Sequence, residues 1–217
     1  MIPDATYWRE CYADPELMDG VFNAEDHAAY LDRLLALEGV TVRTMVDLGF
    51  GLGHLTDAVI AVLRPREVEA TEPSAWARER ALARGLGRVR LDGRPARPRI
   101  RSLDLAAWCA EPPPAAPFDL GVCTSVLHYL DDDALALVIP ALAQRMRYLY
   151  LTLPTAHDLA RQRADEDFND RHAIGRTREQ WWAALSPHFT CVANRLLESR
   201  ALRDPASPSF EDDLYRF

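Results

Sequence analysis

The chain has 217 residues, of which 48% are hydrophobic and 27% are charged, a mixture typical of one globular domain. Its formal net charge of −8 argues against a protein that binds nucleic acid by neutralising phosphates. We expect no signal peptide and no membrane span, because neither a basic leader nor a sufficiently long apolar run is present. The four scattered cysteines form no CxxC pair, which favours a reduced, cytoplasmic chain without a zinc site.

Hydrophobic periodicity predicts helices and strands that alternate along the chain. Residues 1–40 are predicted to be helical, with Asn23 as the N-cap of a helix that begins at Ala24. Further strands are expected at 43–48, 67–72, 98–103, 118–126, 147–153, 188–199 and 212–217, and helices at 54–63, 74–84, 131–145 and 177–185. This alternation requires a parallel sheet covered on both faces. Only a loop separates the last two strands, so we expect them to pair antiparallel at the sheet edge.

The sequence MVDLGFGLGHL, residues 45–55, places three glycines directly after the first predicted strand. A strand, a glycine-rich turn and a helix let backbone N–H groups approach a ligand closely, although a tight turn alone would also need these glycines. The dinucleotide fingerprint has its third glycine where this chain has His54. A Walker site needs a lysine, and the chain contains none.

Four features in order resemble the motifs of class I S-adenosylmethionine-dependent methyltransferases. Asp47 precedes the glycines, Glu72 closes the next strand, Asp104 follows the third strand in SLDL, and Asp119 opens the fourth in FDLGVCTSVLHYL. These motifs span residues 45–130. The resemblance implies an α/β fold with a seven-stranded, mostly parallel, doubly wound sheet, an antiparallel last strand, helices on both faces and an N-terminal helical cap. It also implies one domain, with the cap over 1–40, a cofactor-binding half over 41–153, and a lid segment with a C-terminal hairpin over 154–217.

The same resemblance implies S-adenosylmethionine as the cofactor. Glu72 would accept hydrogen bonds from the ribose hydroxyls, and Asp104 with the N–H of Leu105 would meet the adenine. Asp47 would order the glycine loop and hold the methionine amino end, and a helix N-cap role for Asp47 stays open. Phe50 stands where the family often has a small or polar residue, and we expect it to pack over the cofactor. The full set of predicted cofactor contacts is Asp47, Gly49, Phe50, Gly51, Gly53, Glu72, Pro73, Asp104, Leu105, Cys123 and Thr124.

The residues after the fourth strand distinguish between methyl acceptors. They lack the Asn/Asp-Pro-Pro-aromatic motif of enzymes that methylate base amines. Cys123 follows Val122 and not a proline, so it is interpreted as a buried strand residue and not as a cytosine-5 nucleophile. SVLHYL resembles the VLHHL-type segment of methyltransferases that act on small metabolites, which implies a small-molecule acceptor near His128. A helix-start residue bonded to a neighbour is the alternative for His128.

Methyl transfer from a sulfonium needs chiefly positioning and exclusion of water, and a base only where the acceptor must lose a proton early. His128 and His172 are the candidate catalytic residues. The segment 154–177 is predicted to be a lid without helix, because loops of that length are unusual unless functional. Its acids and histidines match no defined ligand motif, so no metal is predicted. The candidate substrate contacts are Tyr7, Trp8, Tyr12, His128, His157 and His172.

Two other functions stay open on the sequence. The arginine-rich segment, residues 76–101, contains nine arginines against two acids, and it is either a solvated face or a surface for an anionic partner. A protein or RNA methyltransferase would use this segment for docking, with RNA the weaker version because the chain is acidic. A non-catalytic binding protein of the same fold is the other alternative, although such proteins often lose the glycine loop or the ribose acid, and this chain keeps both.

Overall fold

The computed structural model describes residues 19–88, 90–91, 94–95, 98–165 and 170–203. Three predicted substrate contacts lie outside these residues, namely Tyr7, Trp8 and Tyr12. The predicted strand 212–217 also lies outside them. The chain divides into two compact units between Asp104 and Leu105. Within the described residues, no helix is both long enough and apolar enough to cross a lipid bilayer.

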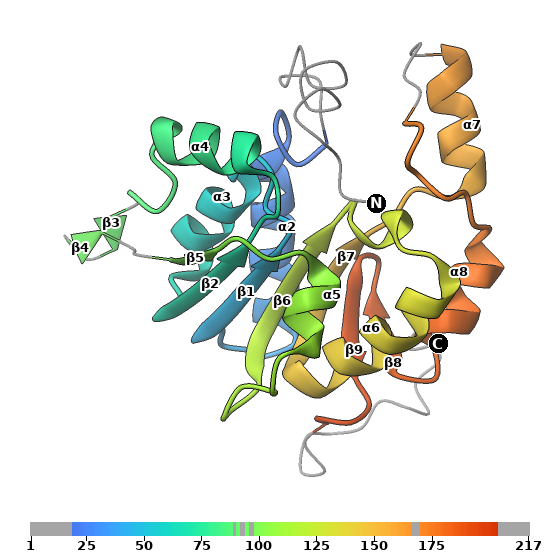
Figure 1. Cartoon of the computed structure of the whole chain (residues 1–217). Coiled ribbons are helices and arrows are strands. Elements are labelled where there is room, and N and C mark those ends of the chain that lie inside the picture. The colour runs from blue at the N-terminus through green and yellow to red at the C-terminus, as the bar shows by residue number, and fades with distance from the viewer. Residues whose placement is uncertain (1–18, 89, 92–93, 96–97, 166–169, 204–217) are drawn as a thin grey trace. The chain divides into compact units, whose positions relative to one another are not determined.

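Seven strands form the main sheet in the order β5-β2-β1-β6-β7-β9-β8 (Figure 1). Strand β1 pairs parallel with β2, β2 with β5, and β6 with β7. Strand β9 pairs antiparallel with both β7 and β8. The prediction of a mostly parallel sheet with an antiparallel last strand is therefore confirmed. The strands are β1 (Thr44–Leu48), β2 (Glu67–Thr71), β5 (Arg99–Arg101), β6 (Phe118–Thr124), β7 (Met146–Thr152), β8 (Phe189–Ala193) and β9 (Leu196–Ser199).

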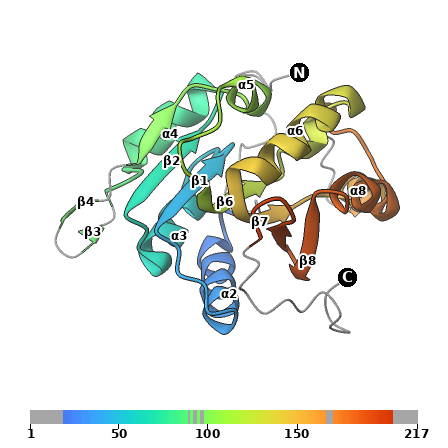
Figure 2. The same cartoon turned by 90° about the horizontal axis from the view of Figure 1, so that it is seen from below.

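Among the described residues before Leu105, three helices accompany β1, β2 and β5. They are α2 (Ala24–Leu37), α3 (His54–Leu63) and α4 (Ala75–Arg84). Helices α2 and α3 pack side by side, as Figure 2 shows. Ser74 caps α4 by accepting the Ala77 N–H, and Gly85 ends it with a φ of 106°. The helix predicted at 54–63 coincides with α3, and the one predicted at 74–84 starts one residue before α4, because hydrophobic periodicity marks both. Helix α2 begins at Ala24 as predicted and ends at Leu37, inside the predicted helical region 1–40.

One local prediction in this unit is corrected, and one short strand pair was not predicted. Asn23 occupies the N-cap position of α2, but its side chain makes no capping bond to the helix. Its Oδ1 accepts the Gly20 N–H at 2.6 Å and its Nδ2 donates to Asp19 Oδ1 at 2.7 Å. The proline-rich loop after α4 also holds a short antiparallel pair, β3 (Arg90–Leu91) and β4 (Arg94–Pro95). Two-residue strands are too short to show as periodicity.

The part of the second unit that the structure describes forms β6, β7, β8 and β9 with four α-helices and one 3₁₀ turn. These are α5 (Leu105–Ala110), η2 (Leu127–Tyr129), α6 (Asp132–Arg145), α7 (Ala156–Asp165) and α8 (Arg178–Leu185). The predicted single strand 188–199 is wrong, because Arg195 has a φ of 70° and the chain turns there between β8 and β9. The antiparallel hairpin of the sheet edge is thus contained within 188–199.

The expectation of a helix-free lid segment is also wrong, because α7 occupies its first half. Thr155 and Asp158 form a reciprocal cap at its start. The Thr155 N–H donates to Asp158 Oδ2 at 2.9 Å, and the Asp158 N–H donates to Thr155 Oγ1 at 3.2 Å. The signal was present as Thr-x-x-Asp, which is a capping-box pattern.

Candidate functional site

The glycine loop, residues 49–53, connects the end of β1 to the start of α3. Its three glycines have φ values of 85°, 54° and 75°, a left-handed conformation that other residues adopt only with strain. The N–H groups of Gly49 and Phe50 both donate to the carbonyl of Thr71, at 2.8 and 3.1 Å. Gly53 is the N-cap of α3. The loop is therefore attached to the carboxyl end of β2 and leads directly into a helix N-terminus.

Glu72 is the first residue after β2, and its side chain is bonded to the glycine loop. The carboxylate is 4% exposed, with Oε2 accepting the Gly51 N–H at 3.0 Å and Oε1 accepting the Ser74 N–H at 2.8 Å. Burial raises the pKa of Glu72, while these two backbone hydrogen bonds oppose the rise. Arg78 fixes the turn by donating to the carbonyl oxygens of Glu72 and Pro73 at 2.6 and 2.7 Å. Each carboxylate oxygen can accept a further hydrogen bond from a ligand hydroxyl.

Asp47 lies within β1, one residue before its end, and links that strand to α3. Its side chain is buried, and Oδ2 accepts the Thr56 hydroxyl at 2.6 Å. Because Gly53 occupies the N-cap position, the alternative in which Asp47 caps α3 is wrong. Burial raises the pKa of Asp47 to about 7, the hydrogen bond from Thr56 lowers it, and the nearby charge of Glu72 raises it further. Two acids with raised pKa values are thus held beside the loop, and a nearby positive charge would favour their ionised forms.

Phe50 has a structural role that differs from the expected one. Its ring is buried in a hydrophobic cluster with Ala70, Ala81 and Leu86, against which Ile100 packs. The side chain therefore fills the core between β2 and α4, so the expectation that it packs over the cofactor is not supported. Only the backbone of Phe50, through its bond to β2, contributes to the glycine loop.

Sequence reasoning missed the ion pair that supports the glycine loop. Arg84 Nη2 donates to Asp57 Oδ2 at 2.8 Å and to the carbonyl of Leu52 at 3.2 Å. Asp57 Oδ1 in turn accepts the Gly87 N–H at 3.0 Å. The pair therefore joins the loop, α3 and the end of α4. In the sequence, Arg84 is one of nine arginines in the same segment, and nothing in its spacing distinguishes it.

Several arginines of the arginine-rich segment are engaged within the protein. Arg99 and Arg101 both contact the Glu69 carboxylate, at 3.4 and 3.3 Å. The Arg80 guanidinium lies 3.9 Å from the centre of the Trp76 ring. The charges that the sequence left for an anionic partner are thus partly used in internal contacts.

Asp104 and Leu105 follow β5 at the edge where β2 also ends. Thr71 is in register with Arg101, and the Glu72 N–H donates to the Arg101 carbonyl at 3.1 Å. Parallel pairing therefore places the residues after β5 beside the turn that carries Glu72. Leu105 is buried as the first residue of α5. Their contacts with adenine stay predictions.

Cys123 and Thr124 are the last two residues of β6, in the second unit. They are in register with Leu151 and Thr152 of β7. Cys123 has no exposed surface, as expected for a buried strand residue. With its side chain in the core, Cys123 could offer a ligand only its backbone. The predicted cofactor contacts of both residues stay predictions.

The two candidate catalytic histidines are connected through Asp170. The His128 ring, 3% exposed, has its Nε2 3.8 Å from Asp170 Oδ2. The Tyr129 hydroxyl donates to the same oxygen at 2.7 Å, and the His172 backbone N–H donates to Asp170 Oδ1 at 3.0 Å. His157, by contrast, is exposed on α7. The His, Cys, Asp and Glu residues that the structure describes include no group of three arranged to hold a metal ion.

No protein-family model matches the chain, and no curated protein sequence matches it either. Solved structures do resemble it. One is an S-adenosylmethionine-dependent methyltransferase from Clostridium acetobutylicum ATCC 824, with a TM-score of 0.62 and 14% identity over 89% of this chain and 96% of that chain. Another is the magnesium protoporphyrin IX methyltransferase of Synechocystis PCC 6803 with bound S-adenosylhomocysteine, with a TM-score of 0.58 and 17% identity over 88% and 91% of the two chains.

A third solved structure is the plantazolicin methyltransferase BpumL in complex with S-adenosylhomocysteine, with a TM-score of 0.62 and 11% identity over 85% of this chain and 70% of that chain. At such low identities these likenesses show the fold and nothing finer. The chain has the Rossmann-like fold of the class I S-adenosylmethionine-dependent methyltransferases.

Proposed function

We propose that this protein is an S-adenosylmethionine-dependent methyltransferase that acts on a small-molecule acceptor. The observation that carries the proposal is the buried Glu72 carboxylate, whose two oxygens are oriented by the N–H groups of Gly51 and Ser74. A carboxylate held in this way at the carboxyl end of β2 can accept both hydroxyls of a ribose. The edge where parallel strands end is also where α/β folds bind nucleotide-like ligands.

Charge supports the same ligand. S-adenosylmethionine carries a sulfonium and an ammonium group, and the glycine loop has two buried acids beside it, Asp47 and Glu72. Burial raises the pKa of each acid, so each gains interaction energy when a cation enters. We assign the amino end of the methionine to Asp47, the ribose to Glu72, and the adenine to Asp104 with the Leu105 N–H. When bound, the cofactor supplies an electrophilic methyl group.

A small-molecule acceptor is favoured by the SVLHYL segment, which places His128 just after β6. Two structures with the same fold belong to proteins named for a porphyrin and for the natural product plantazolicin. Arg101 is largely buried against Glu69, whereas the Arg99 side chain is 72% exposed, so the alternative of a protein or RNA methyltransferase that docks through the arginine-rich segment is decided by the transfer experiment below. We assign His128 as the group that meets the acceptor.

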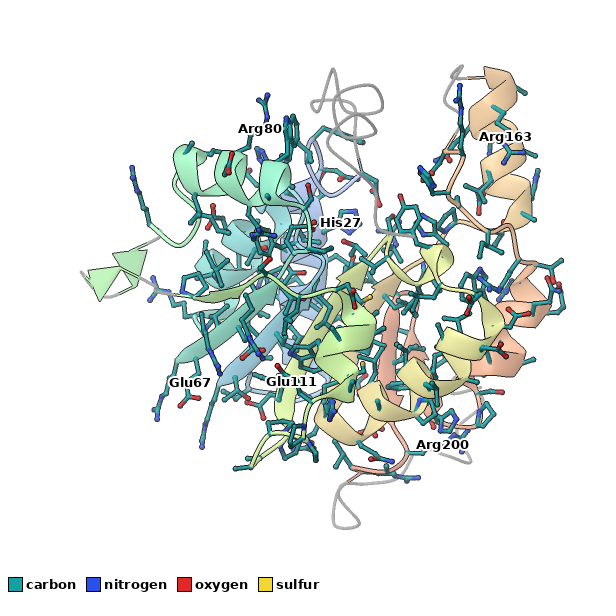
Figure 3. The ribbon with its side chains drawn as sticks, viewed as in Figure 1. His27, Glu67, Arg80, Glu111, Arg163 and Arg200 are labelled. Carbon is teal, nitrogen blue, oxygen red and sulfur yellow. The ribbon has the colours of Figure 1, made fainter. Side chains whose placement is uncertain are left out.

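Calorimetric titration with S-adenosylmethionine and S-adenosylhomocysteine tests the cofactor assignment. We compare the wild type with Glu72→Gln and with Glu67→Gln, a matched control at the exposed start of the same strand (Figure 3). Glu72→Gln is expected to weaken binding roughly 10- to 150-fold, and Glu67→Gln to leave it unchanged. Equal affinities for all three proteins would refute the ribose assignment.

Transfer is tested separately, with S-adenosylmethionine that carries a labelled methyl group. The protein is incubated with a protein-free extract of small metabolites, a protein fraction and an RNA fraction, and the labelled product is identified by mass spectrometry. Label in the metabolite fraction supports the proposal. Label confined to protein or RNA favours the docking alternative, and cofactor binding without any transfer favours a non-catalytic binding protein.

A further inference from the structure

Residues 170–176 of the lid segment are held against the turn that carries His128. The Ile174 N–H donates to the His128 carbonyl at 2.9 Å, and Arg176 Nη2 donates to the Leu130 carbonyl at 2.8 Å. The Tyr129 hydroxyl, on the turn, donates to Asp170 Oδ2 of the lid segment at 2.7 Å. Asp170 is therefore held in place by neighbours on both segments.

The two ring nitrogens of His128 have different surroundings. Nε2 faces Asp170 Oδ2 at 3.8 Å, which is longer than a hydrogen bond but within ion-pair range. Nδ1 is buried and has no hydrogen-bond partner among the described residues. Leaving a buried polar atom unpaired costs about 1–3 kcal/mol, so such an atom needs an explanation.

The Asp170 carboxylate determines which nitrogen carries the proton. It is buried, and it already accepts hydrogen bonds from the Tyr129 hydroxyl and the His172 N–H. A carboxylate facing Nε2 favours the tautomer with hydrogen on Nε2, which leaves the lone pair of the neutral imidazole on Nδ1. Contacts of this kind are often long in the absence of substrate and shorten when it binds.

We propose that Asp170 is a positioning residue for His128, and that Nδ1 of His128 takes the proton of a methyl acceptor that enters as an O–H or N–H compound. The inference rests on the proposed methyltransferase function and narrows its substrate class. Because Nδ1 is buried, the acceptor reaches it only when the side chains that cover it move. The unpaired nitrogen is then satisfied by the acceptor.

The proton and the electron pairs balance in this step. The acceptor proton passes to Nδ1, and the electron pair left on the acceptor oxygen or nitrogen forms the bond to the methyl carbon. The bond between that carbon and sulfur breaks with its electrons on sulfur, which becomes a neutral thioether. The Asp170 carboxylate stabilises the resulting imidazolium, which then loses its proton to solvent.

The tautomer is tested first, because it can be measured without knowing the acceptor. Long-range nitrogen–proton NMR on protein with ¹⁵N-labelled histidine, at a pH where the ring is neutral, separates the two tautomers. The His128 signals are assigned with His128→Gln. We expect hydrogen on Nε2 in the wild type and a mixture in Asp170→Asn. Asp133→Asn, an exposed acid of α6, is the matched control and should resemble the wild type. Hydrogen on Nδ1 in the wild type, or no change in Asp170→Asn, would overturn the proposal.

Turnover with S-adenosylmethionine and a panel of phenols, amines and thiols tests the chemistry. Thiols lose their proton near neutral pH without help, so their methylation should be insensitive to both variants. For phenols or amines we expect His128→Ala to lower kcat roughly 10²- to 10⁴-fold, and Asp170→Asn to lower it less, with KM for the cofactor unchanged. Transfer to thiols alone, or unaltered kcat in both variants, would overturn the proposal. Failure of the wild type to bind the cofactor at all would instead refute the proposed function.

Discussion

The Glu72 carboxylate accepts a hydrogen bond from the backbone N–H of Gly51 at 3.0 Å. The acid that follows β2 is therefore hydrogen-bonded to the middle of the glycine loop. The acid anchors the loop, and in the proposed cofactor site the same carboxylate would also accept the ribose hydroxyls. We therefore expect a substitution at Glu72 to change the stability of the protein as well as its affinity for S-adenosylmethionine.

We expect Glu72→Ala to lower the free energy of unfolding by about 1–3 kcal/mol, because it leaves the N–H groups of Gly51 and Ser74 without their acceptor. Urea unfolding measures this change. Affinity for S-adenosylmethionine should fall roughly 10- to 150-fold in calorimetry. A variant as stable as the wild type would show that the bond between Glu72 and the loop contributes nothing to folding.

Gly53→Ala should destabilise the protein more than Gly39→Ala. Both glycines have a positive φ, 75° and 67°, so alanine costs about 1–2 kcal/mol of backbone strain at either position. A Cβ at Gly53 would also lie 2.8 Å from Leu86 Cδ1, whereas nothing lies within 4 Å of a Cβ at Gly39. We expect the difference, about 1 kcal/mol or more, in denaturant unfolding. If both variants lost the same free energy of unfolding, the Leu86 side chain would move away from the new Cβ without an energetic cost.

The raised pKa of Asp47 predicts a pH dependence of stability. The folded pKa of about 7 lies above the usual 3.8, so the folded protein binds the proton more tightly than the unfolded chain. This contribution to stability, on the order of 4 kcal/mol, is complete below pH 4 and is lost as the pH rises from about 4 to about 7. We expect the free energy of unfolding to fall over this range in the wild type, and to fall less in Asp47→Asn. If the free energy of unfolding had the same pH dependence in the wild type and in Asp47→Asn, the raised pKa of Asp47 would be contradicted.

The same titration should appear in ligand binding. Only the ionised form of Asp47 attracts the amino group of S-adenosylmethionine, so affinity should increase as the pH rises through about 7. Calorimetry at pH 6 and 8 in buffers of different ionisation enthalpy measures both the affinity and the proton release. In Asp47→Asn the affinity should be lower and less dependent on pH.

Arg84→Gln should weaken the contacts that hold the glycine loop against α3 and α4. The variant loses the ion pair to Asp57 and the bonds to the Leu52 carbonyl, which we expect to cost about 0.5–1.5 kcal/mol. Hydrogen exchange of the loop amides should accelerate, and cofactor affinity should fall by up to roughly tenfold. Arg80→Gln is the matched control on the same helix, since Arg80 contacts the Trp76 ring (Figure 3). Equal exchange rates in both variants would exclude a role for Arg84 in the loop.

Much of the first unit was predictable because its signals are local. The glycine spacing, the Ser74 cap and the Gly85 stop lie within a few residues of the structures that they specify. The missed helix α7 was also a local signal, the reciprocal pair of Thr155 and Asp158. The division of 188–199 into β8 and β9 was not predicted. The polar pair Asn194 and Arg195 forms the turn there, but it lacks the glycine that typically marks a two-residue hairpin loop.

The amino-acid sequence by itself determined the alternation of strands and helices, the position of the glycine loop and the acids Asp47 and Glu72 that flank it. Periodicity and backbone sterics act over a few residues, so they can be read along the chain. Only the tertiary structure decided that the Phe50 ring packs into the core, that Arg84 supports the loop, and that Asp170 faces His128. These contacts join residues that are between 20 and 50 positions apart in the sequence. Their partners depend on how the elements pack, which no local pattern encodes.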